Sequence, residues 1–187
     1  GSALSKVTGG SLIVTGVAVA DIETILALDV SPASITISDT AANIQADLVL
    51  GGASEILAAL GTITSVVVGD AGVVSLTLAQ MQVAGVNDGA GSAAALLSGG
   101  SLRVTGITVA EIDTVLAFPE VPDSATVSDT AANIASDLAS GGSSDLLANN
   151  AMLFAITNSN AGAITLTSAQ VQAAGVNDGA GSVLSKV

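Results

Sequence analysis

Four short stretches in the first half of the chain have the pattern of β-strands: three have inward-facing apolar residues at every second position, and one, at residues 63–68, is an apolar run. We expect strands at residues 11–15, 34–38, 63–68 and 73–77. Gly16 is predicted to end the first of them. Residues 69–72 read Gly-Asp-Ala-Gly, which is typical of a tight turn. The last two strands are therefore predicted to form an antiparallel hairpin.

Between these strands, apolar residues follow the spacing of amphipathic helices. Helices are predicted to begin near residues 19, 41, 54, 77 and 93. Asp39 or Thr40 is expected to cap the second helix, and Ser54 the third. The spacings of residues 77 and 80, 108 and 111, and 167 and 170 fit capping boxes, in which two residues satisfy each other's backbone N–H groups.

The whole pattern returns after 90 residues without a gap. Residues 38–44, Ser-Asp-Thr-Ala-Ala-Asn-Ile, recur unchanged as residues 128–134, and residues 85–92 recur unchanged as residues 175–182. We therefore interpret residues 9–98 as repeat 1 and residues 99–187 as repeat 2. Residues 1–7 resemble residues 181–187, so residues 1–8 are interpreted as the end of a preceding repeat.

The predicted fold class is α/β. Each repeat has the predicted order β-α-β-α-β-β-α, and alternating strands and helices favour a mostly parallel sheet, with one hairpin in each repeat. Repeats of this size commonly bury their cores against their neighbours, so the two tandem repeats are expected to stack as a solenoid-like array. Position 13 is Ile and its counterpart is Arg103, so this strand is predicted to have one solvent-facing side.

Composition excludes several partners. The chain has 187 residues, with 16 acidic and 3 basic side chains and a formal net charge of -13. Nucleic acids are bound through many Lys and Arg contacts to phosphate, so nucleic-acid binding is not expected. No apolar run approaches the roughly 18 residues of a transmembrane helix, so membrane insertion is not expected either.

Catalysis is not predicted. The chain contains no histidine and no cysteine, which are common acid–base and nucleophilic groups. Lys6 and Lys186 are the only lysines and lie near the two ends of the chain. Neither a nucleophile-elbow nor a phosphate-loop motif occurs.

Residues 37–44, followed by a strand, a Gly-Asp turn and the segment 76–80, resemble the tandem repeat regions of giant bacterial type I-secreted, RTX-like surface and adhesin proteins. The resemblance implies an extracellular or cell-surface module, structural or adhesive, and calcium as a ligand. The glycine-rich calcium nonapeptide of RTX proteins is absent, so the resemblance carries over no calcium ligand.

The residues themselves suggest one metal site in each repeat. Asn87 and Asp88, with their counterparts Asn177 and Asp178, offer the oxygen ligands that calcium prefers. The alternative is that each Asn-Asp-Gly segment is only a turn after a helix. Other acidic residues are expected to cap helices or to be solvated in first helical turns. These residues are Asp39 and Asp129 as caps, and Asp21, Glu23, Glu111 and Asp113 in first turns.

Two functions fit the sequence. The first is a structural repeat module, serving as spacer, stalk or matrix element, whose partners are neighbouring repeats of the same parent chain. The second is a binding module for calcium or for surface glycans. The first predicts function spread over repeated contacts, and the second predicts a local polar pocket. Hydroxyl side chains on the outward strand positions are the basis of the glycan alternative, although Ser and Thr are also ordinary residues on exposed strands.

Overall fold

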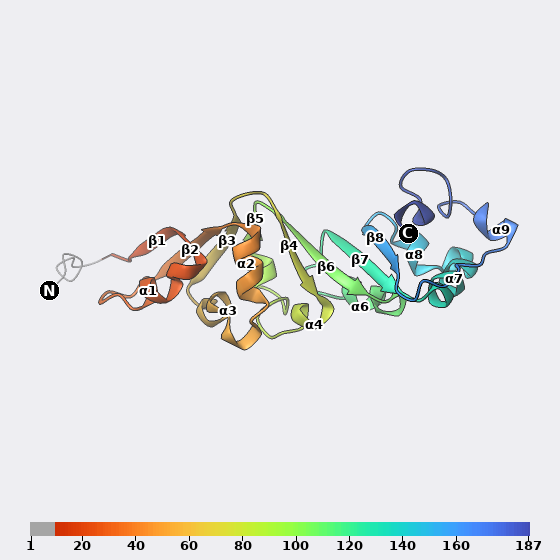
Figure 1. Ribbon diagram of the computed structural model, residues 1–187. Coiled ribbons are helices and arrows are strands. Elements are labelled where there is room, and N and C mark those ends of the chain that lie inside the picture. Colours follow the sequence, from red (N-terminus) through yellow and green to blue (C-terminus); the bar gives the residue numbers. More distant parts are fainter. Residues whose placement is uncertain (1–9) are drawn as a thin grey trace. The chain divides into compact units, whose positions relative to one another are not determined.

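The computed structural model describes residues 10–187, and the chain divides into two compact units, residues 1–102 and 103–187 (Figure 1). The proposed preceding-repeat segment, residues 1–8, lies outside the described residues. No helix in the described range 10–187 is both long and apolar enough to span a membrane.

Unit 1 contains a parallel sheet with the strand order β1-β2-β3-β5. Its strands are β1 (Ile13–Val17), β2 (Ser34–Asp39), β3 (Ile63–Val68), β4 (Val73–Thr77) and β5 (Leu97–Ser98). Its α-helices are α1 (Ile22–Leu26), α2 (Ala41–Leu48), α3 (Glu55–Ala59), α4 (Leu78–Met81) and α5 (Ala93–Leu96). Short 3-10 helices cover Val19–Asp21 and Gly51–Ala53. Helix and strand residues such as Ile22, Ile37 and Ile56 are fully buried and form the core.

Unit 2 begins inside β6 (Ser101–Ile107), which pairs in parallel with β7 (Ser124–Asp129), and β7 pairs in parallel with β8 (Leu153–Asn158). Its α-helices are α6 (Ile112–Leu116), α7 (Ala131–Ala139), α8 (Asp145–Ala148) and α9 (Ser168–Val171). Short 3-10 helices cover Val109–Glu111, Gly141–Ser143 and Val183–Lys186. The second four-stranded sheet has the order β4-β6-β7-β8. The α/β class is thus confirmed, with two four-stranded sheets.

The predicted hairpin between β3 and β4 is wrong, because these strands belong to different sheets. β5 pairs in parallel with β3, placing Leu97 opposite Val66, and so occupies the edge that a hairpin partner would need. The turn at residues 69–72 is instead fixed to helix α2, since Asp70 Oδ1 accepts a hydrogen bond from the Ala41 N–H at 3.0 Å. In unit 2, residues 163–167 form no strand, so no hairpin forms there either.

The prediction that Gly16 ends the first strand is also wrong. β1 continues through Gly16 to Val17, with a bulge between Thr15 and Val17. Gly16 has a φ of +71°, which a residue with a Cβ rarely adopts. The bulge changes the strand's register and returns the Val17 side chain to the core, where it is 5% exposed.

The predicted helix starts are confirmed. Thr40 is the cap of α2, because its hydroxyl oxygen accepts a hydrogen bond from Asn43 N–H at 3.2 Å. Ser54 caps α3 in the same way. The three predicted capping boxes all form, beginning at Thr108, at Thr77 and at Thr167. Local hydrogen bonding by Ser and Thr is therefore what separates these short helices from the strands before them.

The solvent-facing side of the first strand in each unit is confirmed. The Ile13 side chain is 63% exposed. Its counterpart Arg103 places its guanidinium 3.8 Å from the centre of the Phe154 ring and donates a hydrogen bond from Nε to the Ser124 hydroxyl at 3.0 Å.

The order of elements from β1 to β3 recurs 90 residues later from β6 to β8, with β2 starting at Ser34 and β7 at Ser124.

Candidate functional site

A carboxylate stands at the end of the central strand in unit 1. Asp39 ends β2, and its Oδ2 accepts a hydrogen bond from Val19 N–H at 2.9 Å. Its Oδ1 accepts hydrogen bonds from Thr40 N–H at 2.8 Å and from Asn43 Nδ2 at 2.7 Å. Partial burial alone would raise the pKa of Asp39, but these three bonds together lower it below the ordinary value. One ionised side chain therefore ties β2 to the two helical segments beside it.

Unit 2 repeats this arrangement atom for atom. Asp129 ends β7, and its Oδ2 accepts from Val109 N–H at 2.9 Å. Its Oδ1 accepts from Thr130 N–H and from Asn133 Nδ2, both at 2.7 Å. Burial again acts to raise the pKa of Asp129, and the hydrogen bonds outweigh it and lower the pKa. The prediction that Asp39 and Asp129 cap helices is wrong, because Thr40 and Thr130 are the caps of α2 and α7. Each Asp carboxylate instead accepts a hydrogen bond from the backbone N–H of the cap residue and from a segment 20 residues earlier in the chain.

A second anchor joins the turn after β3 to the start of α2. Asp70 Oδ1 accepts from Ala41 N–H at 3.0 Å and from Gly72 N–H at 3.1 Å, and these two bonds lower the pKa of the exposed Asp70 carboxyl. In unit 2, Asn160 Oδ1 accepts from the corresponding backbone groups, Ala131 N–H at 3.2 Å and Gly162 N–H at 3.1 Å. Because an amide oxygen does the same work as a carboxylate, the position requires an acceptor and not a negative charge.

A third anchor is buried. Asp47 in α2 is 5% exposed, and its Oδ2 accepts from the Ser54 hydroxyl, seven residues later, and from Ile56 N–H at 3.1 Å. Its Oδ1 accepts from Glu55 N–H at 2.8 Å. The carboxylate thereby accepts hydrogen bonds from the first backbone N–H groups of α3, which have no partner inside that helix.

The same anchor recurs in unit 2 with Asp137 and Ser144. Asp137 accepts from the Ser144 hydroxyl at 2.5 Å, from Asp145 N–H at 2.9 Å and from Leu146 N–H at 3.2 Å. Burial raises the pKa of Asp145, and the nearby charges of Asp113 and Asp137 raise it further. Our sequence prediction missed both pairs, although the recurrence of an Asp and a Ser seven residues apart in each copy was a usable signal.

An open hollow lies beside these carboxylates in each unit. The hollow of unit 1 has a volume of about 310 Å³, and that of unit 2 about 300 Å³. The positions common to both are the anchors and their neighbours, whereas Ala46 and Leu50 of unit 1 are replaced by serines in unit 2. Both carboxylates that border each hollow already accept backbone hydrogen bonds. The hollows therefore share the residues that fix the fold and differ in the polarity of two lining side chains.

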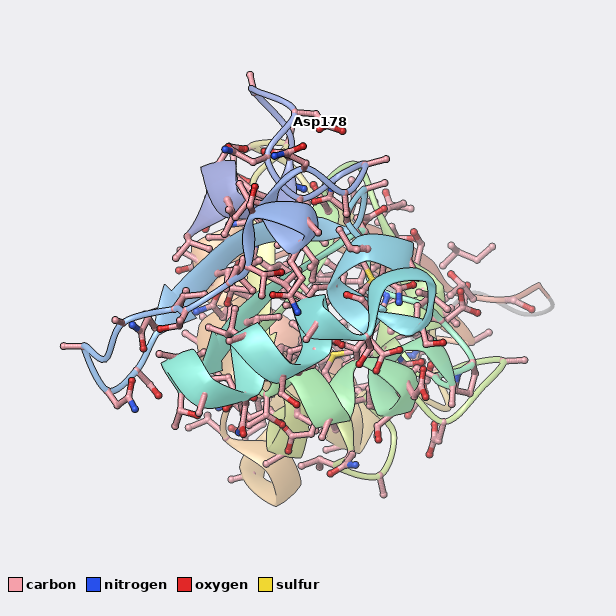
Figure 2. The ribbon with its side chains drawn as sticks, turned by 90° about the vertical axis from the view of Figure 1, so that its right-hand side faces the viewer. Asp178 is labelled. Atoms are coloured by element: carbon pink, nitrogen blue, oxygen red, sulfur yellow. The ribbon has the colours of Figure 1, made fainter. Side chains whose placement is uncertain are left out.

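The predicted calcium ligands close turns. Asp88 Oδ2 accepts from Gly85 N–H at 2.9 Å, and Asp178 Oδ2 accepts from Gly175 N–H at 2.6 Å. Figure 2 shows Asp178 on an outer loop, with its side chain directed away from the fold. Asn87 is buried, whereas its counterpart Asn177 is exposed. The two copies thus present one exposed carboxylate each, and calcium binding by these residues stays a prediction.

The remaining acidic candidates stay apart. Asp21, Glu23 and Asp113 are exposed in first helical turns, as predicted. Glu111 also lies in a first helical turn, where it is half-buried and closes the predicted capping box by accepting a hydrogen bond from Thr108 N–H at 2.7 Å. Within residues 10–187, no three acidic side chains come together in a group that could hold a metal ion.

The described basic residues have structural partners as well. Lys186 Nζ donates to the Asn150 carbonyl oxygen, and burial lowers the pKa of Lys186. Arg103 stacks on Phe154. The site therefore offers side-chain acceptors that fix the backbone.

Comparison of the chain with protein-family models, curated proteins and solved structures finds no match.

Proposed function

We propose that this chain is a structural repeat module of a large extracellular bacterial surface or adhesin protein, serving as spacer, stalk or matrix element without catalysis. The observation that carries the proposal is the recurrence of three side-chain anchors in both units, at residues 39 and 129, 47 and 137, and 70 and 160. In each, the polar atoms bind the protein's own backbone. Selection for a stable repeated unit accounts for such a pattern more simply than selection for a ligand.

Neighbouring repeats of the same parent chain are the proposed partners, arranged as a solenoid-like stack of 90-residue repeats. Support comes from the residues around the predicted repeat junction. Leu97 and Ser98 pair with β3, and Ser101 N–H donates to the Gly72 carbonyl oxygen at 3.1 Å. A junction that lies in paired strands, in place of a flexible linker, suits an array in which each repeat contacts the next. The extracellular location rests on the resemblance of residues 37–44 and 76–80 to secreted repeat proteins.

A spacer is expected to unfold under tension in discrete steps. With the two ends of the chain tethered and pulled, we expect two cooperative events, each releasing on the order of 300 Å of chain, since an extended residue spans roughly 3.5 Å. Single-molecule force spectroscopy measures these steps directly. A gradual extension without steps would contradict the proposal, because a spacer must hold its length under load. The recording is repeated in chelator, to separate the role of the fold from that of calcium.

The second candidate is a calcium- or glycan-binding adhesive module. The net charge of -13 and the exposed carboxylates of Asp88 and Asp178 in the two Asn-Asp-Gly turns favour it. A cation that binds only the folded chain raises its melting temperature by mass action. Calcium can also act by screening an acidic surface, and screening depends on ionic strength alone. The two effects are therefore separable.

Thermal melting in calcium, in chelator, and in chelator with added sodium chloride distinguishes them. Under the structural proposal, we expect salt to restore whatever stability calcium provides. A fitted site would give a calcium-specific rise that is lost in the Asp88→Ala, Asp178→Ala double variant. The control is the Asp21→Ala, Asp29→Ala double variant, which removes the same charge from exposed positions.

A further inference from the structure

One segment has different surroundings in the two units. In unit 1, β4 is a strand whose Val74 and Leu76 side chains are 0% and 1% exposed. The corresponding residues 163–167, Ala-Ile-Thr-Leu-Thr, form no strand, and Ile164 and Leu166 are only half-buried. Figure 1 draws β4 as an arrow and the chain before α9 as a loop. Residues 163–167 thus have a strand-like sequence but pair with no strand in the described part of the chain.

The residues that contact the start of β4 in unit 1 show which sequence can pair beside such a segment. Just before β4, the Gly72 carbonyl oxygen accepts a hydrogen bond from Ser101 N–H, the first residue of β6, at 3.1 Å. Gly100 lies so close to this turn that a Cβ on it would stand 2.6 Å from the Gly72 carbonyl oxygen. The sequence Gly-Gly-Ser-Leu at residues 99–102 therefore fits closely against the start of β4.

The same sequence occurs at residues 9–12, leading into β1. Within residues 10–187, β1 is an edge strand whose sheet partner is β2. Leu12 and Val14 are half-buried, whereas their counterparts Leu102 and Val104 are 7% and 0% exposed. An unpaired edge of this kind is a template for pairing with another chain.

The backbone of β1 is oriented for such pairing. The Leu12 carbonyl oxygen accepts a hydrogen bond from Ala33 N–H at 2.8 Å, so the backbone groups of Leu12 face β2. Successive residues of a strand direct their backbone groups to opposite edges, and those of Ile13 therefore face the unpaired edge. The Ile13 side chain is 63% exposed, so changes at this position leave the core intact.

We propose that copies of this chain associate head to tail, with β1 of one copy adding as a strand alongside residues 163–167 of the next. The occupant is a second copy because β1 carries the sequence that meets β4 within unit 1. Such a contact joins two different surfaces, so it continues into open chains of copies and does not close into a symmetric dimer. The inference rests on the proposed function only in taking 90 residues as the repeating unit.

Asn158 sets the strength of this contact. Its Nδ2 donates to the Gly162 carbonyl oxygen at 2.6 Å, and Gly162 is the counterpart of the Gly72 that binds Ser101. The position equivalent to Asn158 in unit 1 is Val68, which makes no such bond. We expect Asn158→Val to free this carbonyl and to shift association to lower protein concentration.

The test is sedimentation velocity of the full 187-residue chain over a range of concentrations and salt. The expected result is a series of species that grows with concentration. Ile13→Pro removes the N–H that faces the unpaired edge and should abolish association. The matched control is Ile13→Arg, which installs the residue found at position 103, keeps the N–H and should associate like the original chain. Loss of association in both variants would indicate a contact through the exposed Ile13 side chain and would overturn strand addition.

A mixing experiment tests the head-to-tail geometry. Ile164→Pro should block the other end of the contact, and its melting curve reports whether unit 2 remains folded. Each Pro variant alone should be monomeric, whereas their mixture should form a dimer and nothing larger, because one intact contact remains. A monomer at all concentrations up to about 1 mM, or a symmetric dimer of either Pro variant, overturns the proposal. Neither result bears on the force measurement, which tests the spacer function in a single chain.

Discussion

Asp47→Ala is expected to lower the free energy of unfolding by about 3 kcal/mol, because it leaves several buried donors without an acceptor. The lost acceptor serves the Ser54 hydroxyl and the Glu55 and Ile56 N–H groups. Since Asp47 is 5% exposed, water cannot readily replace it. Urea unfolding followed by circular dichroism measures the loss.

The matched control is Asp29→Ala, which removes the same charge from an exposed position and should change the stability little. Asp137→Ala tests the same anchor in unit 2, and we expect a smaller loss there because Asp137 is half-buried. Equal and small effects of Asp47→Ala and Asp29→Ala would show that the buried anchor does not stabilise unit 1.

Helix starts were predictable from sequence because their causes are local. Thr77 and Gln80 satisfy each other's backbone N–H groups across three residues, and this needs no knowledge of the rest of the fold. The choice between Asp39 and Thr40 as cap was not predictable, since both side chains can reach the first turn of α2. The structure assigns the cap to Thr40 because Asp39 is held by Val19, 20 residues earlier.

Strand partners were less predictable, because they depend on distant segments. The turn at residues 69–72 has hairpin chemistry, yet β5, about 30 residues later, takes the free edge of β3. Likewise, the bulge at Gly16 follows from register against β2, which the alternation of residues 11–15 cannot reveal. A short two-residue strand such as β5 has almost no pattern of its own.

The candidate site was predictable in part. The unchanged residues 38–44 and 128–134 pointed to Asp39 and Asp129, and both prove to be structural. The role of Asp47 was not predicted, because its partner Ser54 lies beyond the 3-10 helix at Gly51–Ala53. That turn brings the two side chains together only in the folded chain. Comparing the two copies position by position is the signal that recovers it.

The fold is expected to lose stability in acid, because three carboxyl pKa values are lowered in the folded chain. The pKa values of Asp39, Asp70 and Asp129 are lowered in the fold, so the unfolded chain binds protons more readily at these residues. Their contribution is full above the ordinary value of 3.8 and is lost as pH falls through the folded pKa values. Asp145 acts in the opposite direction, because its raised pKa means that protonation favours the fold. Three lowered values against one raised value predict a net loss of stability in acid.

The Asp39→Asn, Asp129→Asn double variant isolates this effect. Near neutral pH we expect the unfolding free energy to fall by about 2 kcal/mol for each of the two structural units, because an amide replaces a charged acceptor of three hydrogen bonds. As the pH falls, the unfolding free energy of the variant should decrease less steeply than that of the original chain. Plots of the unfolding free energy against pH, each point measured by urea unfolding, should therefore converge below the ordinary Asp pKa of 3.8. The Asp21→Asn, Asp29→Asn variant removes two exposed charges and should keep the original steepness. If the plots of unfolding free energy against pH are parallel for all three proteins, acid unfolding arises from overall charge and not from the carboxylates at the ends of β2 and β7.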